Sequence, residues 1–213
     1  MDDAEPTDTQ RTRPLVLASA SPRRAQLLGL LGRPFEIRIA DVDESQLGDE
    51  QPMTHVARLA GAKAAAIDST GAEIVVGADT VVVLDGEILG KPKDADQARE
   101  MLARLSGRDH VVLTGVAVRH GDDVRSTVVS TTVTMRDIAR EEIAAYVATG
   151  EPFDKAGGYG IQGLGGRFVE RIDGNYQNVV GLPLTAVESL LSELSADASV
   201  PPWPGPSSQP PSS

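Results

Sequence analysis

The sequence predicts a mixed α/β domain, and three observations support this class. Short runs of β-branched and apolar residues recur along the chain, and such runs are typical of buried strands. Amphipathic stretches at helical spacing stand between several of these runs. Two longer β-type stretches, residues 111–118 and 124–135, flank Gly121-Asp122 and predict a hairpin. Strands and helices that alternate in this way are characteristic of α/β architectures.

The first half of the chain predicts a strand, a helix, a strand and a helix in that order. Residues 14–18 are largely apolar and indicate a strand. Ser21 and Pro22 then begin a helix, with serine at the N-cap and proline at the first helical position. Residues 35–39 alternate apolar and polar side chains, as a strand does. The next helix carries apolar residues at helical spacing: Met53, Val56, Leu59, Ala60, Ala64 and Ile67.

The second half continues the alternation. Two short strands are expected on either side of Asp79. A helix over residues 95–105 is expected to end with Gly107 in a C-cap role. After the hairpin, the pattern predicts a helix over 141–148, a short strand over 167–172 and a last helix over 184–194.

Length and charge limit the classes of function. The 213 residues suit one domain over 14–196, with a polar tail over 1–13 and a Pro/Ser-rich tail over 197–213 that are both expected to be disordered. The 20 Lys and Arg against 31 Asp and Glu give a net charge of -11, which argues against a nucleic-acid or anionic-membrane surface. A small anionic ligand needs only a local basic pocket, so this class stays open.

Residue types that bind metals or form disulfides are scarce. The chain has no Cys, which excludes disulfides and fits a reducing compartment, so a cytoplasmic location is expected. The three histidines, His55, His110 and His120, lack metal-ligand spacing, and no zinc site is expected. A hard cation held by carboxylates remains open. No signal peptide or membrane-spanning apolar stretch is expected either.

Asp79 is the strongest single candidate for a functional residue. It stands between the apolar runs of residues 75–76 and 81–84, and burying an unpaired carboxylate there would be very costly. A cationic partner is therefore expected, either a metal or a lysine, and Lys91 follows in the sequence Gly90-Lys91-Pro92. The alternative is a turn aspartate that caps a neighbouring amide.

Residues 18–24, with the sequence ASASPRR, predict an anion site. A strand leads into a serine-containing turn and then into a helix N-terminus, whose free amides and dipole attract anions. Arg23 and Arg24 add donors suited to phosphate. A capped helix with two solvated arginines is the alternative.

Two further charged positions are candidates. Asp41, Asp43 and Glu44 follow a predicted strand, and clustered carboxylates suit Mg²⁺ or Mn²⁺ bridged to substrate phosphates; an exposed acidic loop is the alternative. Lys63 falls beside the apolar stripe of its helix and can point into a cleft, with ordinary snorkelling of its stem as the alternative.

The glycine-rich segment around Gln162 has a formal match to G-x-G-x-x-G at Gly158, Gly160 and Gly163. A dinucleotide-binding motif requires a strand before it and a helix after it, and neither is predicted here. Gln162 is the one side chain in the segment that can both donate to and accept from a planar ring. A base-reading loop and a tight structural loop are therefore the two interpretations.

Together these segments resemble the Maf family of nucleoside triphosphate pyrophosphatases, from about Leu15 to about Leu191. The resemblance rests on many short stretches in a fixed order: ASASPRR at 18–24, DE at 43–44, AKA at 62–64, GADT at 77–80, GKP at 90–92, LSG at 105–107, DKAG at 154–157, YGIQG at 159–163 and VGLPL at 180–184. It implies an α/β fold with a bent central sheet flanked by helices around a cleft, similar to the inosine triphosphate pyrophosphatases.

The resemblance also implies an activity and a set of site residues. Family members cleave a nucleoside triphosphate into monophosphate and pyrophosphate, and this chain resembles the branch acting on dTTP and UTP. Asp79 matches the general base, with Glu44, Lys63 and Lys91 as charged cleft residues. Because a triphosphate is highly anionic, a bound Mg²⁺ or Mn²⁺ is also expected, held by Glu44 and Asp79. The positions that match substrate-binding residues are Ser19, Arg23, Arg24, Thr80 and Gln162.

Two other functions remain open. One is a nucleotide-binding regulator of cell division or septum formation without turnover, and the other is a phosphatase acting on sugar or nucleoside monophosphates. The expected partner is a nucleoside triphosphate, with no nucleic acid and no membrane, and a homodimer is left open.

Overall fold

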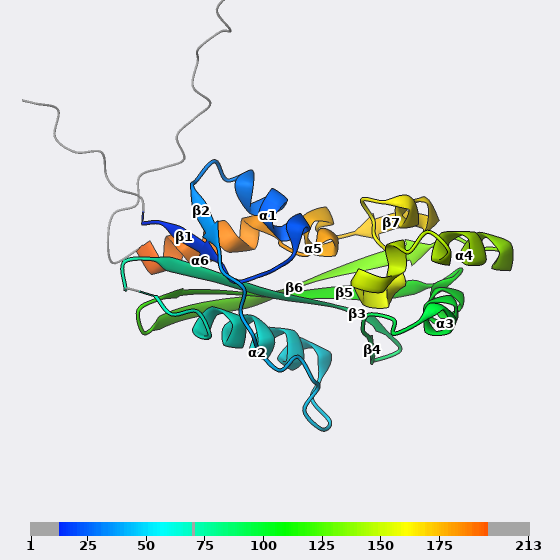
Figure 1. Cartoon of the computed structure of the whole chain (residues 1–213), viewed down its shortest axis with the longest axis horizontal. Helices are drawn as coiled ribbons and strands as arrows, with labels where there is room; N and C mark the ends of the chain where they lie inside the picture. Colours follow the sequence, from blue (N-terminus) through cyan, green and yellow to red (C-terminus); the bar gives the residue numbers. More distant parts are fainter. Residues whose placement is uncertain (1–12, 70, 196–213) are drawn as a thin grey trace, which may run out of the picture.

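The computed structural model describes residues 13–69 and 71–195, and these form one open sheet with helices on its faces (Figure 1). The predicted tails lie almost wholly outside the described residues. The strands are β1 (Leu15–Leu17), β2 (Phe35–Ile37), β3 (Ile74–Leu84), β4 (Glu87–Leu89), β5 (Asp109–His120), β6 (Asp123–Met135) and β7 (Val169–Asp173). The helices are α1 (Pro22–Gly29), α2 (Pro52–Ala65), α3 (Ala95–Leu105), α4 (Arg140–Val147), α5 (Tyr176–Val180) and α6 (Leu184–Ser195). Three 3-10 helices complete the fold: η1 (Glu151–Asp154), η2 (Ala156–Gly158) and η3 (Leu164–Phe168).

The sheet is mixed, with strand order β2-β1-β3-β5-β6-β7 and β4 paired to β3. β1 runs parallel to both β2 and β3, whereas β3, β5, β6 and β7 pair antiparallel. The predicted hairpin is confirmed, since β5 and β6 pair along their whole length and Gly121 adopts a positive φ of 58° in the turn. The mixed α/β class is therefore confirmed as well.

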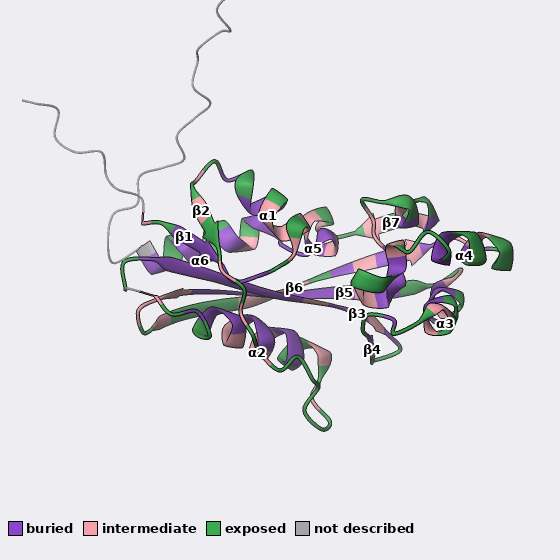
Figure 2. Ribbon diagram, viewed as in Figure 1, coloured by how far each residue is buried: buried purple, intermediate pink, exposed green. Residues whose placement is uncertain are grey.

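The core lies on both faces of the sheet because successive side chains of a strand point to opposite sides. Ile74 and Val76 of β3 pack with α1 and α6 on one face, whereas Val75 packs with Ala60 and Ala64 of α2 on the other. A further cluster joins α3 and α4 to the far end of the sheet. Burial is accordingly concentrated along β3 and β5 (Figure 2).

The strand that carries Asp79 corrects the prediction at this point. β3 is one continuous strand of 11 residues, and Asp79 pairs with Gly115 in its middle. The two short strands expected on either side of Asp79, and the alternative of a turn aspartate, are therefore wrong. A polar residue within an apolar run looks like a break in the strand, but a single buried carboxylate with a partner does not interrupt the hydrogen-bond ladder.

Other elements were missed or displaced. The strand expected over 167–172 begins later, at Val169, because η3 occupies the preceding residues. β4 and α5 were not predicted; with 3 and 5 residues, both are too short to show a periodic pattern. The elements directly before Gly160 are the 3-10 helices η1 and η2 and not a strand, so the rejection of a dinucleotide-binding motif stands, although the 3-10 helix η3 follows Gly163.

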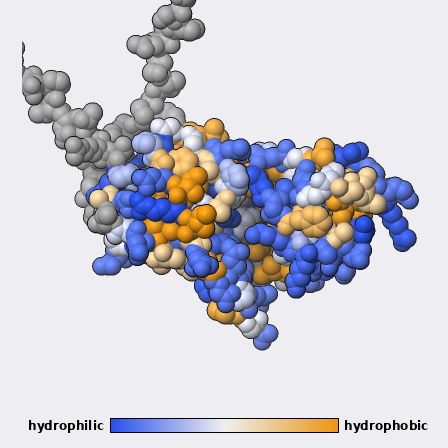
Figure 3. Space-filling model, in the orientation of Figure 1, coloured by the Kyte–Doolittle hydropathy of each residue, from blue (hydrophilic) through white to orange (hydrophobic). Residues whose placement is uncertain are grey.

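The surface is mostly hydrophilic on the face seen in Figure 3, with an apolar area over β2 and the chain after it. There Ile37 and Ile39 are 54% and 71% exposed. Within the described part of the chain, no helix has the length and apolar character needed to cross a membrane.

Candidate functional site

The candidate site lies at a gap in the edge of β3. β1 pairs with residues 74–76 of this strand and β4 pairs with residues 82–84, so the stretch between them has no strand partner on that side in the described chain. Asp79, Thr80 and Val81 of this stretch line a cavity of about 680 Å³, which side chains from both faces of the sheet reach. Its volume is within the usual range for small-molecule sites.

Asp79 is 7% exposed and points to the α2 side of the sheet, where it meets Lys63. The Lys63 Nζ donates to Asp79 Oδ1 at 2.7 Å and also lies 2.6 Å from Glu44 Oε1. One ammonium therefore bridges two carboxylates. The prediction that Asp79 has a cationic partner is confirmed, but this partner is Lys63 and not Lys91.

Glycines bring α2 close enough for this contact. A Cβ at Gly77 would lie 2.3 Å from the Ala60 carbonyl oxygen, and one at Gly115 would lie 2.2 Å from the Val56 carbonyl oxygen. Such distances are far below van der Waals contact, so any larger residue would push the helix off the sheet. The short helix–sheet distance places Lys63 within reach of Asp79.

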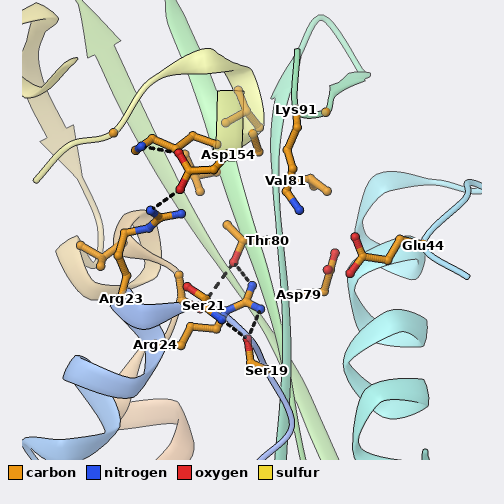
Figure 4. Close-up of a pocket in the computed structure, with 18 of the residues that line it drawn as sticks. Ser19, Ser21, Arg23, Arg24, Glu44, Asp79, Thr80, Val81, Lys91 and Asp154 are labelled. Atoms are coloured by element: carbon orange, nitrogen blue, oxygen red, sulfur yellow. Dashed lines mark hydrogen bonds and ion pairs between the residues drawn. The ribbon is translucent and has the colours of Figure 1, made fainter. Parts of the chain in front are cut away.

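Glu44 and Lys91 complete this side of the cavity. Burial acts to raise the pKa of Glu44, but the hydrogen bond and charge of Lys63, with the charges of Lys91 and Arg24, outweigh it and hold the pKa below its usual value. Glu44 thus stays ionised although it is half-buried. Lys91, on the chain after β4, points into the same space (Figure 4).

Arg24 lies on the other face of β3, and most of its donors are already used within the protein. Its Nε donates to the Gly181 carbonyl oxygen at 2.9 Å, and its Nη1 donates to the Ala78 carbonyl oxygen at 2.8 Å and to Ser19 Oγ at 3.3 Å. Its Nη2 donates to Thr80 Oγ1 at 3.0 Å (Figure 4). Burial lowers the pKa of Arg24, and the nearby carboxylates only partly offset this effect. Arg24 therefore organises the turn and the unpaired edge of β3.

The serine turn differs from a simple capped helix. Ser21 occupies the N-cap position as predicted, yet its side chain makes no capping hydrogen bond. Instead its backbone N–H donates to Ser19 Oγ at 3.2 Å, which also accepts from Arg24. Thr80 Oγ1 is likewise engaged, because it lies 3.0 Å from both Arg24 Nη2 and Thr114 Oγ1.

Arg23 extends to the opposite wall. Its Nη1 donates to Asp154 Oδ2 at 2.9 Å, and Lys155 Nζ donates to the other oxygen of the same carboxylate at 2.5 Å. Asp154 and Lys155 were not among the predicted site residues. The only signal available was their place within the DKAG stretch, because no local pattern reports an ion pair between residues 131 positions apart.

All nine predicted site residues line this one cavity: Ser19, Arg23, Arg24, Glu44, Lys63, Asp79, Thr80, Lys91 and Gln162. Counted over the described lining residues, five are Lys or Arg and three are Asp or Glu. The local excess is positive in a protein whose net charge is -11. Such a cavity attracts an anion that the rest of the surface would repel.

Two carboxylates of the cavity, Glu44 and Asp79, are the candidate metal ligands. No group of three or more His, Cys, Asp or Glu that could hold a metal occurs in the part of the chain that the structure describes. Glu44 and Asp79 do lie together, bridged through Lys63. One or two carboxylates with substrate phosphates are a common way to bind Mg²⁺, so this pair fits a cation that arrives with a phosphate ligand.

The fold and the cavity define an α/β protein with a cavity whose described lining has more Lys and Arg than Asp and Glu. Residues 14–194 match the family described as Maf-like protein. The chain belongs to the Maf family. It is 50% identical over 186 residues to the dTTP/UTP pyrophosphatase of Pseudoalteromonas atlantica, and the match covers 85% of this chain and 97% of that protein. It is also 50% identical over 184 residues to the dTTP/UTP pyrophosphatase of Escherichia coli O157:H7, with coverage of 85% and 93%.

Two solved structures are similar at a lower level. A HAM1 protein from Coxiella burnetii has a TM-score of 0.46 at 15% identity and covers 87% of this chain and all of that chain. A nucleoside-triphosphatase, dITP/XTP pyrophosphatase, from Mycobacterium abscessus has a TM-score of 0.41 at 14% identity, with coverage of 88% and 100%.

Proposed function

We propose that this chain hydrolyses dTTP and UTP to the nucleoside monophosphate and pyrophosphate. The observation that carries the proposal is the placement of Asp79, bridged by Lys63 to Glu44, in one cavity with Arg23, Arg24 and Lys91. A triphosphate needs such a local positive excess to approach an acidic protein. The activity named for the two relatives at 50% identity supports the same reaction.

Different residues of the cavity bind the phosphates and activate the water. Arg23 and Lys91 have side chains directed at the cavity and offset phosphate charge, whereas Arg24 holds the turn and the edge of β3 in place. Asp79 orients the attacking water or accepts its proton as the water attacks phosphorus in line. Lys63 holds one oxygen of Asp79, so the other oxygen is the one directed to this task.

A divalent cation, Mg²⁺ or Mn²⁺, would be held by Glu44 and Asp79. When bound, it would supply positive charge that stabilises the negative charge developing on the phosphates. An aspartate that ligates a cation is a weaker base, so the two roles of Asp79 compete.

The products of UTP hydrolysis test the reaction type. With UTP or dTTP and Mg²⁺ or Mn²⁺, we expect monophosphate and pyrophosphate in equal amounts, measured by ion-exchange chromatography. UDP with inorganic phosphate would contradict cleavage between the α and β phosphates. Binding of UTP without any turnover would favour the regulator of cell division, and release of phosphate from monophosphates would favour the phosphatase.

Replacing Gln162 with glutamate should weaken binding of the UTP transition state by roughly 1–3 kcal/mol, which appears as a lower kcat/KM for UTP. Uracil and thymine present an acceptor beside a donor, and an amide matches both, whereas a carboxylate can only accept. Gln162 is exposed at the cavity wall, so folding should not change. The measurement is kcat/KM for UTP, dTTP, CTP, GTP and 7-methyl-GTP.

Gln97→Glu is the matched control for this variant, because it adds the same charge on α3, outside the residues that line the cavity. The Gln97→Glu variant should leave kcat/KM unchanged for all five nucleotides. Equal kcat/KM for all five nucleotides in the wild type, or a preference for 7-methyl-GTP, would contradict the assignment of base preference.

The location and assembly are also proposals. The absence of cysteine from the sequence supports a cytoplasmic location, which cell fractionation would test. A homodimer stays a prediction, and light scattering of the purified protein measures it directly.

A further inference from the structure

The loop that carries Gln162 is hydrogen-bonded to an acidic side chain that is not among the described residues lining the cavity. Gly160, Ile161, Gln162 and Gly163 all line the cavity. Glu151, at the start of η1, contacts this loop through the backbone N–H groups of Leu164 and Gly165. It can therefore affect a ligand through the backbone that it holds.

Glu151 accepts three hydrogen bonds with its two carboxylate oxygens. Its Oε2 accepts from the Leu164 backbone N–H at 2.9 Å, and its Oε1 accepts from the Gly165 backbone N–H at 3.0 Å. The Tyr146 hydroxyl donates to Oε1 at 2.9 Å. Because η3 begins at Leu164, the carboxylate caps the first free amides of that helix from a separate segment.

The start of the same loop is held by Tyr146. Its hydroxyl accepts from the Gly160 backbone N–H at 3.3 Å while it donates to Glu151. Tyr146 and Glu151 therefore bind the backbone on both sides of Gln162, at residues 160 and 164–165. Ile161 packs against the core, and the Gly163 N–H donates to the Gly160 carbonyl oxygen at 3.1 Å within the loop. The contacts of Tyr146 and Glu151 add to these by holding the two ends of the segment that carries Gln162.

The glycines show how closely the loop approaches the two side chains. A Cβ at Gly163 would lie 2.5 Å from Glu151 Oε1, and a Cβ at Gly165 would lie 2.7 Å from the Tyr146 hydroxyl oxygen. Only glycine permits such an approach. The glycine-rich sequence is thus explained by the Glu151 contact as well as by the cavity.

The electrostatics of Glu151 agree with this geometry. Burial acts to raise the pKa of Glu151, but the hydrogen bonds from Gly165, Leu164 and Tyr146 outweigh it, and the pKa lies below its usual value. The side chain is therefore an ionised acceptor near neutral pH.

The segment that follows Glu151 reaches the phosphate side of the cavity. Lys155 Nζ donates to the Glu151 carbonyl oxygen at 2.7 Å and to Asp154 Oδ1 at 2.5 Å. Asp154 in turn accepts from Arg23. One short stretch, residues 151–155, thus contacts the Gln162 loop at one end and the arginine of the anion site at the other.

We propose that Glu151 is a positioning residue for base selection: it holds the loop over residues 159–166 so that Gln162 faces the base of the nucleotide. This inference rests on the proposed function. It adds a residue outside the cavity to those that determine which nucleotide is preferred. Base selection then depends on Glu151, whereas the chemistry at Asp79 does not.

Replacing Glu151 with glutamine tests the proposal. Glutamine keeps the shape but has one acceptor oxygen, so its NH₂ group must face a loop N–H or the Tyr146 hydroxyl. The ratio of kcat/KM for UTP to that for CTP should fall about tenfold, while kcat for saturating UTP stays within about threefold of the wild type. Tyr146→Phe should change the ratio in the same direction by a smaller factor.

Glu142→Gln is the matched control. Glu142 accepts from the Ala139 backbone N–H and from Arg136, so the substitution removes a comparable set of hydrogen bonds on α4. It should leave the UTP to CTP ratio unchanged. A melting temperature for each variant separates a loss of folding from a loss of selectivity.

Amide hydrogen exchange of a peptide over residues 159–166 gives a readout independent of activity. Exchange should be faster in Glu151→Gln than in the wild type. Unchanged exchange, an unchanged UTP to CTP ratio, or a wild type with no base preference would each overturn the inference. A wild type that releases no pyrophosphate would instead reject the proposed function, and the exchange measurement would still decide whether Glu151 holds the loop.

Discussion

Replacing Asp79 with asparagine should lower kcat for UTP by roughly 10²- to 10⁴-fold, which is the usual contribution of a general base. Asparagine keeps the shape of the side chain and a carbonyl oxygen that can accept from Lys63 Nζ, now 2.7 Å from Asp79 Oδ1. It removes the negative charge and the proton-accepting oxygen. Steady-state kinetics with saturating UTP and Mg²⁺ measure the change.

The fold should survive this substitution because the Lys63 ammonium keeps a counter-charge. Glu44 Oε1 lies 2.6 Å from the same Nζ, so the lysine is not left as a buried, unpaired ion. The melting temperature is the check. Asp109→Asn is the matched control: this aspartate also lies on the sheet, accepts from Thr134 Oγ1 at 2.6 Å, and is outside the residues lining the cavity. Near-wild-type turnover in Asp79→Asn would transfer the catalytic role to Glu44.

Removing divalent cations with EDTA should lower turnover by at least about a hundredfold, because a bound cation typically supplies several kcal/mol of charge stabilisation. The site places Glu44 and Asp79 beside the path of a highly anionic substrate, and Lys63 is already engaged by both carboxylates. The remaining cations are too few to offset a triphosphate and two carboxylates. UTP turnover is measured before and after chelation.

Restoration of activity by excess Mg²⁺ or Mn²⁺ is the control, and Ca²⁺ of equal concentration tests whether coordination geometry matters. Glu44→Gln should raise the Mg²⁺ concentration needed for half-maximal turnover. Full activity in EDTA would remove the cation from the mechanism and leave the lysines and arginines as the source of charge stabilisation.

Much of the fold could be predicted because local patterns carry the information. The helix expected over 95–105 agrees with α3 at both ends, and Gly107 beyond it has a positive φ of 68°. Its C-cap role is not confirmed, because the C-cap residue is Ser106 and the Gly107 N–H donates to the Arg136 carbonyl oxygen instead of a helix carbonyl. The hairpin was recognisable from two β-type stretches around Gly121-Asp122. β4 and α5 could not be found, since pairing and packing with other elements stabilise such short segments.

The candidate residues were predictable individually, but their contacts were not. Lys63 was singled out from its place beside the apolar stripe, and Asp79 from its apolar flanks. That these two side chains meet depends on the register of β3 and on the approach of α2 that Gly77 allows. Lys91 is closer to Asp79 along the sequence than Lys63 is, yet the lysine that donates to Asp79 is Lys63.

The roles of the two arginines separate only in three dimensions. In the sequence, Arg23 and Arg24 are adjacent at a helix N-terminus, and nothing local separates their roles. In the fold, consecutive residues of a helix point about 100° apart. Arg24 therefore faces Gly181, Ala78 and Thr80 and uses its donors there, whereas Arg23 reaches Asp154 across the cavity.

The amino-acid sequence by itself determined the α/β class, the order of the long elements and the residue types that meet a polyanion, because periodicity and side-chain chemistry are local properties. Only the tertiary structure decided that Lys63 pairs with Asp79, that β3 leaves its edge open between β1 and β4, and that Glu151 holds the loop of Gln162. These contacts join residues far apart in the chain. Strand register and helix packing place them, and no local pattern encodes either one.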